Sequence, residues 1–217
     1  MKQTANLQSK HWLDKVVDGI LKWQAKTALE QLHVDDMKTP SGRVHTGALR
    51  GVLLHDLVAQ VLRQRGVETE NTYVFNDMDP MDGLPAYLDE TEFGQHMGKP
   101  LYRIPKPDLE KCGIDLTQTS AAELADLEKA RNFAELYAID FIHAFRALGC
   151  SQEIVWSHEL YESGKMDNLI RLALDSITPL RKIYQEVAKY ELPENWYPFQ
   201  VICPVCGKVG TTLVTGW

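Results

Sequence analysis

Apolar and polar positions along the chain predict helices that alternate with strands. Helices are expected at 12–28, 46–65 and 120–148. Strands are expected at 29–34, 72–75 and 153–156. Because strands joined through helices pair in parallel, this order predicts an α/β fold: a doubly wound parallel sheet with helices on its faces.

The helix at 46–65 has the clearest pattern. Two neighbouring apolar lines run along it, and so broad a stripe is typical of a helix packed on a sheet. The lines are Leu49, Leu53, Leu57 and Val61, and beside them Leu54, Val58 and Leu62. Gly66 is placed to cap the C-terminus of this helix.

Other signals mark where elements begin and end. Ser120 to Glu123 form a capping box that opens the helix of 120–148, and Gly149 should terminate it. The residues of this helix expected to face inward are Leu127, Ala134, Ala138, Phe141, Ile142 and Phe145. A last helical region spans 166–190, where Pro179 should divide it and Thr178 should cap the second piece. Residues 84–119 are rich in Pro, Gly and charge and lack periodicity, so they are interpreted as an excursion from the core.

Composition narrows the class of protein. The chain has 217 residues, 44% of them hydrophobic and 24% charged, which is typical of a globular domain. The net charge of −7 argues against a non-specific nucleic-acid coat, and no DNA partner is expected. No apolar run approaches a membrane span and no signal peptide is recognisable, so a cytoplasmic protein without a membrane partner is expected.

The most informative stretch follows the first strand. Thr39 to Ala48 turn through Pro40, Ser41 and Gly42 and lead into the next helix with His45 and Gly47. Unpaired N–H groups and the positive end of a helix dipole make such a helix start suited to phosphate. The spacing matches neither of the two common glycine-rich phosphate motifs. Polar clusters at 76–83 and 157–161 follow the other strands; alone, each is interpreted as an ordinary loop.

The stretch resembles the HIGH signature of class I aminoacyl-tRNA synthetases, and more narrowly of the class I lysyl-tRNA synthetases. The family carries T-P-S-G-x-x-H-x-G-N-x-R in this turn, and the chain matches with Thr39–Gly42, His45, Gly47 and Arg50. Further similar blocks, in chain order, are Asp77 and Asp79, Ser157 with Glu159–Tyr161, Ile170–Ala173, Leu192–Pro198, and Cys203-Pro204. The resemblance therefore covers nearly the whole chain and implies a Rossmann-like, HUP-type nucleotide-binding domain.

The resemblance implies an enzyme, a lysine–tRNA ligase. Such an enzyme activates lysine with ATP and Mg²⁺ to lysyl-adenylate and transfers the lysyl group to tRNA(Lys). His45 would hydrogen-bond phosphate oxygens, and Gly47 would leave room for the nucleotide. The residues expected to bind ATP are Pro40, Ser41, Gly42, His45, Gly47 and Ala48. Those expected to bind lysine are Thr39, Gly42, Asp77 and Asp79, with less weight on Asp82.

Cys203 and Cys206 form a C-x-x-C half-site, which needs two more ligands for a closed zinc site. In the family this position opens a zinc-binding insertion. Zn²⁺ is therefore conceivable in a full-length protein, whereas two free thiols are the better interpretation for the chain as given. The expected division is a catalytic half-domain at 1–195 and the beginning of a zinc-ribbon-like insertion at 196–217.

The chain departs from the family pattern in several places. Ala48 replaces the asparagine or histidine expected after Gly47, which removes a hydrogen-bonding group from the ATP site. The stretch 129–133 lacks the metal ligands of some members, and His143 and His158 are interpreted as surface or satisfied core histidines. No KMSKS element and no anticodon-binding region are recognisable, so the chain is expected to be an N-terminal portion of a synthetase.

Two functions of different classes remain open. The chain could be the catalytic segment of a lysine–tRNA ligase, or a non-catalytic adenylate-binding or interaction module derived from one. A different class I specificity is a weaker third alternative. The sequence does not decide which carboxylate contacts the lysine ε-amine.

Overall fold

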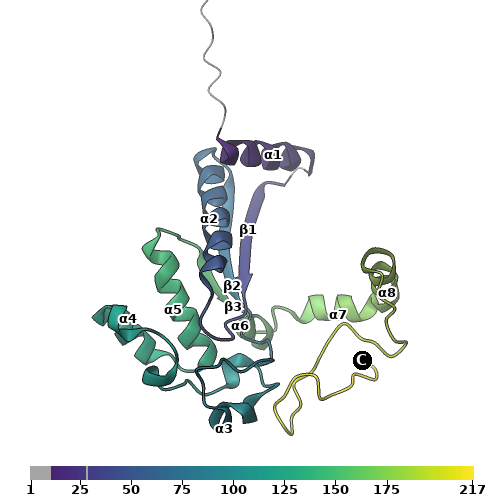
Figure 1. Ribbon diagram of the computed structural model, residues 1–217. Coiled ribbons are helices and arrows are strands. Elements are labelled where there is room, and N and C mark those ends of the chain that lie inside the picture. Colours follow the sequence, from purple (N-terminus) through teal and green to yellow (C-terminus); the bar gives the residue numbers. More distant parts are fainter. Residues whose placement is uncertain (1–10, 28) are drawn as a thin grey trace, which may run out of the picture. The chain divides into compact units, whose positions relative to one another are not determined.

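A computed structural model describes residues 11–27 and 29–217 (Figure 1). The strands are β1 (Gln31–Lys38), β2 (Glu68–Phe75) and β3 (Glu153–Trp156). The α-helices are α1 (Trp12–Thr27), α2 (Leu49–Gln64), α3 (Glu90–Phe93), α4 (Ala121–Lys129), α5 (Phe133–Ala147), α6 (Ser157–Glu162), α7 (Asp167–Asp175) and α8 (Ile177–Ile183). A 3₁₀ turn, η1 (Thr46–Ala48), leads directly into α2.

The three strands form one parallel sheet in the order β1-β2-β3. This confirms the predicted α/β class and is consistent with a Rossmann-like domain. By their contacts, the residues of the chain divide into two compact units. Unit 1 comprises the described residues up to Lys38, His45–Val74 and Ala144–Ile154, and unit 2 comprises Thr39–Val44, Phe75–His143 and Val155–Trp217.

Unit 1 is built on α2, which packs against both β1 and α1. Its apolar core includes Val17, Leu32 and Leu62. The predicted stripe is only partly right, because the buried apolar residues of α2 are Val52, Ala59 and Leu62, whereas Leu54 and Leu57 are exposed. Gly66 follows α2 with φ +80°, which confirms it as the helix terminator. The helix expected at 46–65 is thus confirmed.

Two strands of the sheet are longer than the sequence pattern predicted. β2 begins at Glu68, and its first half is polar, yet Asn71 is buried there. The amide of Asn71 donates to the buried carboxylate of Asp56 (2.9 Å), which also accepts from the backbone N–H of Ser151 (3.0 Å). A buried polar strand of this kind shows no apolar periodicity, which is why the prediction began at Thr72.

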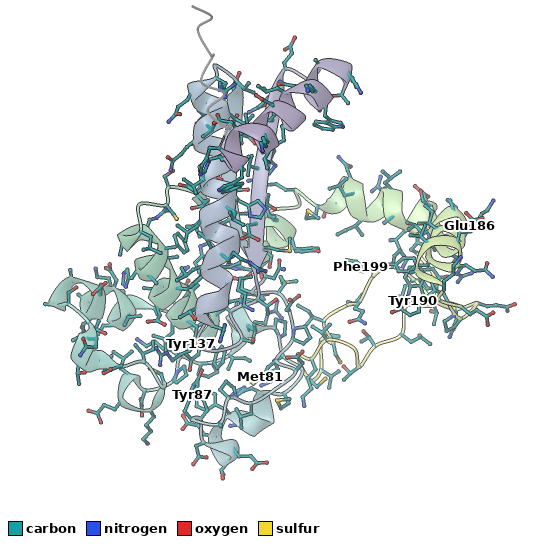
Figure 2. The ribbon with its side chains drawn as sticks, turned by 45° about the horizontal axis from the view of Figure 1, so that its top comes forward. Met81, Tyr87, Tyr137, Glu186, Tyr190 and Phe199 are labelled. Atoms are coloured by element: carbon teal, nitrogen blue, oxygen red, sulfur yellow. The ribbon has the colours of Figure 1, made fainter. Side chains whose placement is uncertain are left out.

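The segment 84–119, predicted to be an excursion from the core, lies within unit 2 and has buried apolar residues of its own. Its side chains form, with α4 and α5, an apolar cluster within unit 2. The fully buried members from this segment and from α5 include Leu101, Ile104, Cys112, Phe133 and Tyr137. The apolar residues are spaced by prolines and 3₁₀ turns, so they share a core without a period of 2 or 3.6. Figure 2 shows Met81 and Tyr137 of unit 2, both within this cluster.

The predicted helix of 120–148 is in fact two helices, α4 and α5, separated at Ala130–Asn132. The Lys106 ammonium donates to the carbonyls of Leu127 and Glu128 and so satisfies the end of α4. Asn132 accepts the backbone N–H of Glu135 and begins α5. The capping box of Ser120 and Glu123 is confirmed, and so is the end at Gly149, with φ +84°.

The last helical region breaks at Ser176, two residues before the predicted cap at Thr178. α7 and α8 are separated at Ser176, and Pro179 lies in the first turn of α8. A proline there removes no helical hydrogen bond, because the first N–H groups of a helix have no partner within it. Thr178 is inside the helix and is not its cap. Among the described residues, no helix is both long and apolar enough to cross a membrane.

Candidate functional site

The predicted site residues belong to both units. Those from His45 to Ala48 lie in unit 1, and those up to Gly42, with Asp77 and Asp79, lie in unit 2. His45 begins the helical segment of unit 1, and its Nδ1 accepts the backbone N–H of Gly47 at 2.9 Å. A ring nitrogen that accepts a hydrogen bond carries no proton, so the neutral imidazole has its proton on Nε2. The exposed ring therefore presents an N–H donor outward at the start of a helix.

Gly47 is required by the same contact. A Cβ at this position would lie 2.9 Å from His45 Nδ1 and would displace the ring. Ala48 follows, and its N–H donates to the carbonyl of His45 (2.9 Å), but its side chain caps nothing. The helix start is consequently held by His45 alone among these side chains.

The preceding turn, Thr39–Val44, belongs to unit 2. The Thr39 hydroxyl donates to Asp79 Oδ2 at 2.5 Å, which ties the turn to the residues after β2. Gly42 has φ +147°, a conformation that strongly favours glycine, and Pro40 is buried. The structure thus brings together two of the residues predicted to bind lysine, Thr39 and Asp79.

Asp77 has a different environment from Asp79. It is fully buried, and its Oδ1 accepts from the Ser157 hydroxyl and the His158 N–H, both at 2.9 Å. Its Oδ2 pairs with Nδ1 of His158. The His158 ring stacks on Tyr102, with ring centroids 4.7 Å apart. Both oxygens of Asp77 therefore have partners within the protein.

Sequence reasoning missed this buried cluster. The prediction that His158 is a surface or satisfied core histidine holds, since it pairs with Asp77, but its specific partner was not predicted. The sequence does hold a signal: Asp77 lies two residues after β2, Ser157-His158 directly follow β3, and these two strands are neighbours in the sheet. The ends of such strands lie at one sheet edge, so their polar side chains can meet.

Asp79 is exposed and lines a cavity of about 260 Å³ within unit 2. The other lining residues are Met78, Pro80, Tyr161, Pro198, Phe199, Gln200, Ile202 and Val209. The cavity thus has one carboxylate, mainly apolar walls and no basic side chain. Such a lining disfavours phosphate and suits an alkyl chain that ends in an ammonium group. Asp82 is exposed as well but does not line this cavity.

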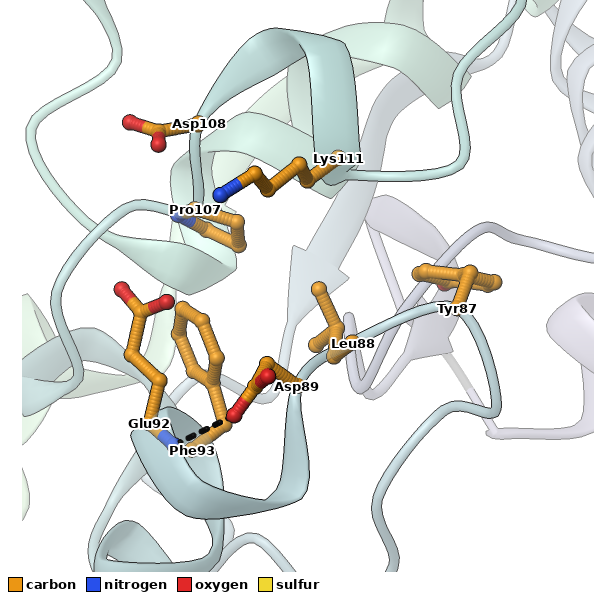
Figure 3. A pocket seen from close by; sticks show the side chains of 8 residues that line it. All are labelled: Tyr87, Leu88, Asp89, Glu92, Phe93, Pro107, Asp108 and Lys111. Atoms are coloured by element: carbon orange, nitrogen blue, oxygen red, sulfur yellow. Dashed lines mark hydrogen bonds between the residues drawn. The ribbon is translucent and has the colours of Figure 1, made fainter.

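A second cavity of unit 2, about 360 Å³, lies in the segment 84–119 (Figure 3). It is lined by Tyr87, Leu88, Asp89, Glu92, Phe93, Pro107, Asp108 and Lys111. None of these residues was predicted to bind a ligand. Asp89 is already used as the N-cap of α3, where it accepts the N–H of Glu92 at 2.9 Å.

Cys203 and Cys206 form a tight loop. The N–H of Gly207 donates to the Cys203 carbonyl (2.8 Å), and the N–H of Cys203 to the Lys208 carbonyl (2.9 Å). Within the described part of the chain, no group of three or more His, Cys, Asp or Glu side chains is arranged to hold a metal ion. Cys203 and Cys206 are therefore at most half of the four ligands that a closed zinc site needs.

The loop should make one thiol more reactive than the buried ones. Hydrogen bonds from the backbone of Cys206 and then of Val205 lower the pKa of Cys203, whereas burial raises the pKa of Cys112 and of Cys150. We expect iodoacetamide at neutral pH to label Cys203 faster than Cys112 or Cys150 by roughly tenfold or more. Peptide mass spectrometry over a time course measures this, with urea-unfolded protein as the control in which the rates converge. Equal rates in the folded chain would contradict the arrangement.

Comparison with known proteins identifies the family of this chain. A family model described as tRNA synthetases class I (K) matches residues 10–119 and 120–217. The chain belongs to this family. The resemblance inferred from the HIGH-like turn is thereby confirmed.

Individual relatives agree with the family. A lysine–tRNA ligase of Methanosarcina barkeri strain Fusaro is 31% identical over 207 residues, which is 95% of this chain and 34% of the relative. One from Archaeoglobus fulgidus is 28% identical over 95% of this chain and 37% of the relative. The chain thus spans about a third of the length of these curated relatives.

Proposed function

We propose that this chain is a catalytic segment of a lysine–tRNA ligase, in which lysine reacts with ATP to form lysyl-adenylate before transfer to tRNA(Lys). The observation that carries the proposal is the helix start of His45–Gly47, where a fixed imidazole presents its Nε2–H. Attack of the lysine carboxylate on the α-phosphorus of ATP releases pyrophosphate. The protein's part in such a step is alignment and stabilisation of charge on the phosphates.

For ATP, His45 would donate to a phosphate oxygen as negative charge develops. Gly47 keeps the imidazole in place, in addition to leaving room for the nucleotide. Pro40, Ser41 and Gly42 remain proposed contacts of ATP, and Ala48 would contribute backbone only. Mg²⁺ would arrive with ATP as part of the substrate.

For lysine, the proposal places Asp79 as the carboxylate that neutralises an amine. Asp79 is exposed, is fixed by Thr39 and lines the cavity with Tyr161 and Phe199. The aliphatic stem of lysine would pack on these aromatic walls, while the ammonium group would meet the carboxylate. Gly42 would adjoin this side of the turn.

Asp77 remains proposed for the lysine side with a changed role. Because its two oxygens already accept from Ser157 and His158, it would act through His158. The Asp77 contact places the proton of a neutral imidazole on Nδ1, which leaves Nε2 as an acceptor. His158 could then accept a hydrogen bond from a substrate amine or hydroxyl.

The proposed division into residues 1–195 and 196–217 is retained as a proposal, with the second part as the beginning of a zinc-ribbon-like insertion. Cys203 and Cys206 would supply half of its zinc ligands. A bound Zn²⁺ would contribute to folding of that segment rather than to chemistry on ATP.

The lysine assignment has a direct test. Asp79→Asn keeps the hydrogen bond from Thr39 but removes the charge, so we expect the affinity for lysine to fall roughly 10- to 100-fold. Calorimetric titration with lysine in the presence of ATP measures the effect, and norleucine, which lacks the ε-amine, should bind weakly to both proteins. Asp82→Asn is the matched control, since Asp82 is exposed and outside the cavity.

An equal loss in the two variants would remove Asp79 from the lysine site. Binding of ATP and lysine without exchange of pyrophosphate into ATP would favour the alternative function, an adenylate-binding module without turnover. Exchange assays with other amino acids would reveal a different class I specificity.

A further inference from the structure

The segment 84–119 contacts the turn Thr39–Val44 at two neighbouring residues, all within unit 2. The backbone N–H of Arg43 donates to the Tyr87 hydroxyl at 2.8 Å. The guanidinium Nη1 of Arg43 donates to the carbonyl of Gly113, also at 2.8 Å. The backbone N–H and the guanidinium of Arg43 therefore both donate to the segment 84–119.

Gly42 fits closely against the same side chain. A Cβ at Gly42 would lie 2.8 Å from the Tyr87 hydroxyl oxygen and 3.0 Å from Cγ of Pro85. Gly42 thus satisfies two requirements at once: its φ of +147° and the approach of Tyr87. The peptide between Gly42 and Arg43 is held at a short distance from the tyrosine oxygen.

The ring of Tyr87 is itself held in place by Gly113 and Tyr137. Its ring lies on Gly113, where a Cβ would come within 2.7–2.9 Å of ring carbons and where φ is +76°. Tyr137 of α5, fully buried, lies nearby with ring centroids 6.3 Å apart and donates its hydroxyl to the Cys112 carbonyl (3.0 Å). Figure 2 labels Tyr87 and Tyr137, and Figure 3 shows Tyr87 at one end of the cavity of this segment.

The contacts form a continuous path from the core of unit 2 to the turn. Tyr137 and Cys112 are core residues, Gly113 supports the ring of Tyr87, and the hydroxyl of Tyr87 fixes Arg43. No recognisable motif of the chain includes Tyr87 or Gly113. The turn that they fix carries Ser41 and Gly42, to which the proposed function assigns contacts with ATP and lysine.

We propose that Tyr87 is a positioning residue for the substrate turn, holding the Gly42–Arg43 peptide in its binding conformation through its hydroxyl group. This inference rests on the proposed function, since it concerns the same ATP-binding turn. A turn ordered before the nucleotide arrives loses less conformational freedom on binding, and that difference appears as affinity. Removal of the hydroxyl should therefore weaken nucleotide binding without removing any atom that touches the nucleotide.

The test compares Tyr87→Phe with the unsubstituted chain. Phenylalanine keeps the ring on Gly113, so the fold is retained, but Arg43 loses its acceptor. We expect hydrogen exchange of the Arg43 amide, followed by NMR, to become about 5-fold faster, and the Kd for ATP to rise by a similar factor. Tyr190→Phe is the matched control, because Tyr190 is exposed and its hydroxyl makes no hydrogen bond to the described residues.

Each other outcome has a definite meaning. Unchanged exchange of the Arg43 amide would refute the contact, and faster exchange with an unchanged Kd for ATP would show that Tyr87 supports structure only. Both would leave the proposed function intact. If the unsubstituted chain did not bind ATP, the proposed function and the positioning role would fall together, even with the Arg43 contact confirmed.

Discussion

Replacing His45 by alanine is expected to slow lysine-dependent exchange of pyrophosphate into ATP by about 10²–10³-fold, the usual effect of removing one preorganised donor to a developing charge. The structural reason is the contact between Nδ1 and the N–H of Gly47, which fixes the proton on the outward-facing Nε2. A donor fixed in this way costs no reorganisation during the reaction. The effect should therefore fall mainly on the rate and little on the KM for ATP.

His55→Ala is the matched control for this prediction. His55 lies on α2, and its Nδ1 contacts the Gly51 carbonyl at 2.8 Å, so its loss should alter exchange by less than about threefold. Equal effects of the two substitutions would mean that His45 serves the helix start and not the chemistry. Gly47→Ala should resemble His45→Ala, because the added Cβ displaces the imidazole.

Replacing Phe133 by alanine is expected to destabilise the protein by about 3–5 kcal/mol, the range for removing a buried aromatic side chain. Phe133 is fully buried at the start of α5, with Tyr137 at 4.8 Å and Phe93 at 6.4 Å between ring centroids. Phe93 comes from the segment 84–119. The prediction thus tests whether that irregular segment and α5 share a core.

Urea unfolding followed by circular dichroism measures this free energy. Leu172→Ala is the control, since the side chain on α7 is 60% exposed and its removal should change stability by less than about 0.5 kcal/mol. A loss below about 1 kcal/mol for Phe133→Ala would show that 84–119 contributes no core. The variant Phe93→Ala should then be equally mild.

The parts of the fold with a regular period could be predicted from the sequence. The helix α2 and the capping box of α4 each have a local physical cause, and both are confirmed. The exact apolar stripe of α2 is not, since Leu54 and Leu57 are exposed. The polar half of β2 could not be recognised, because its burial depends on Asp56, a residue on another element. The break between α4 and α5 depends on Lys106 in the same way, since this distant side chain satisfies the carbonyls at the end of α4.

The candidate site shows the same division between local and distant causes. His45, Gly47 and the turn before them could be recognised from consecutive residues, and the family match confirms the resemblance that they carry. Tyr87 and His158 could not, because Tyr87 lies 44 positions from Arg43 and His158 lies 81 positions from Asp77. Only the folded chain shows that Asp77 is buried against His158 whereas Asp79 is exposed to a cavity.

The central claim is that this chain handles lysine and adenylate together. Calorimetric titration with a non-hydrolysable sulfamoyl analogue of lysyl-adenylate tests it most directly, because binding requires no turnover. The account predicts saturable binding that is at least tenfold tighter than binding of the norleucyl analogue, and that is weakened by Asp79→Asn but not by Asp82→Asn. Equal affinity for the lysyl and norleucyl analogues, or no binding of either, would contradict it.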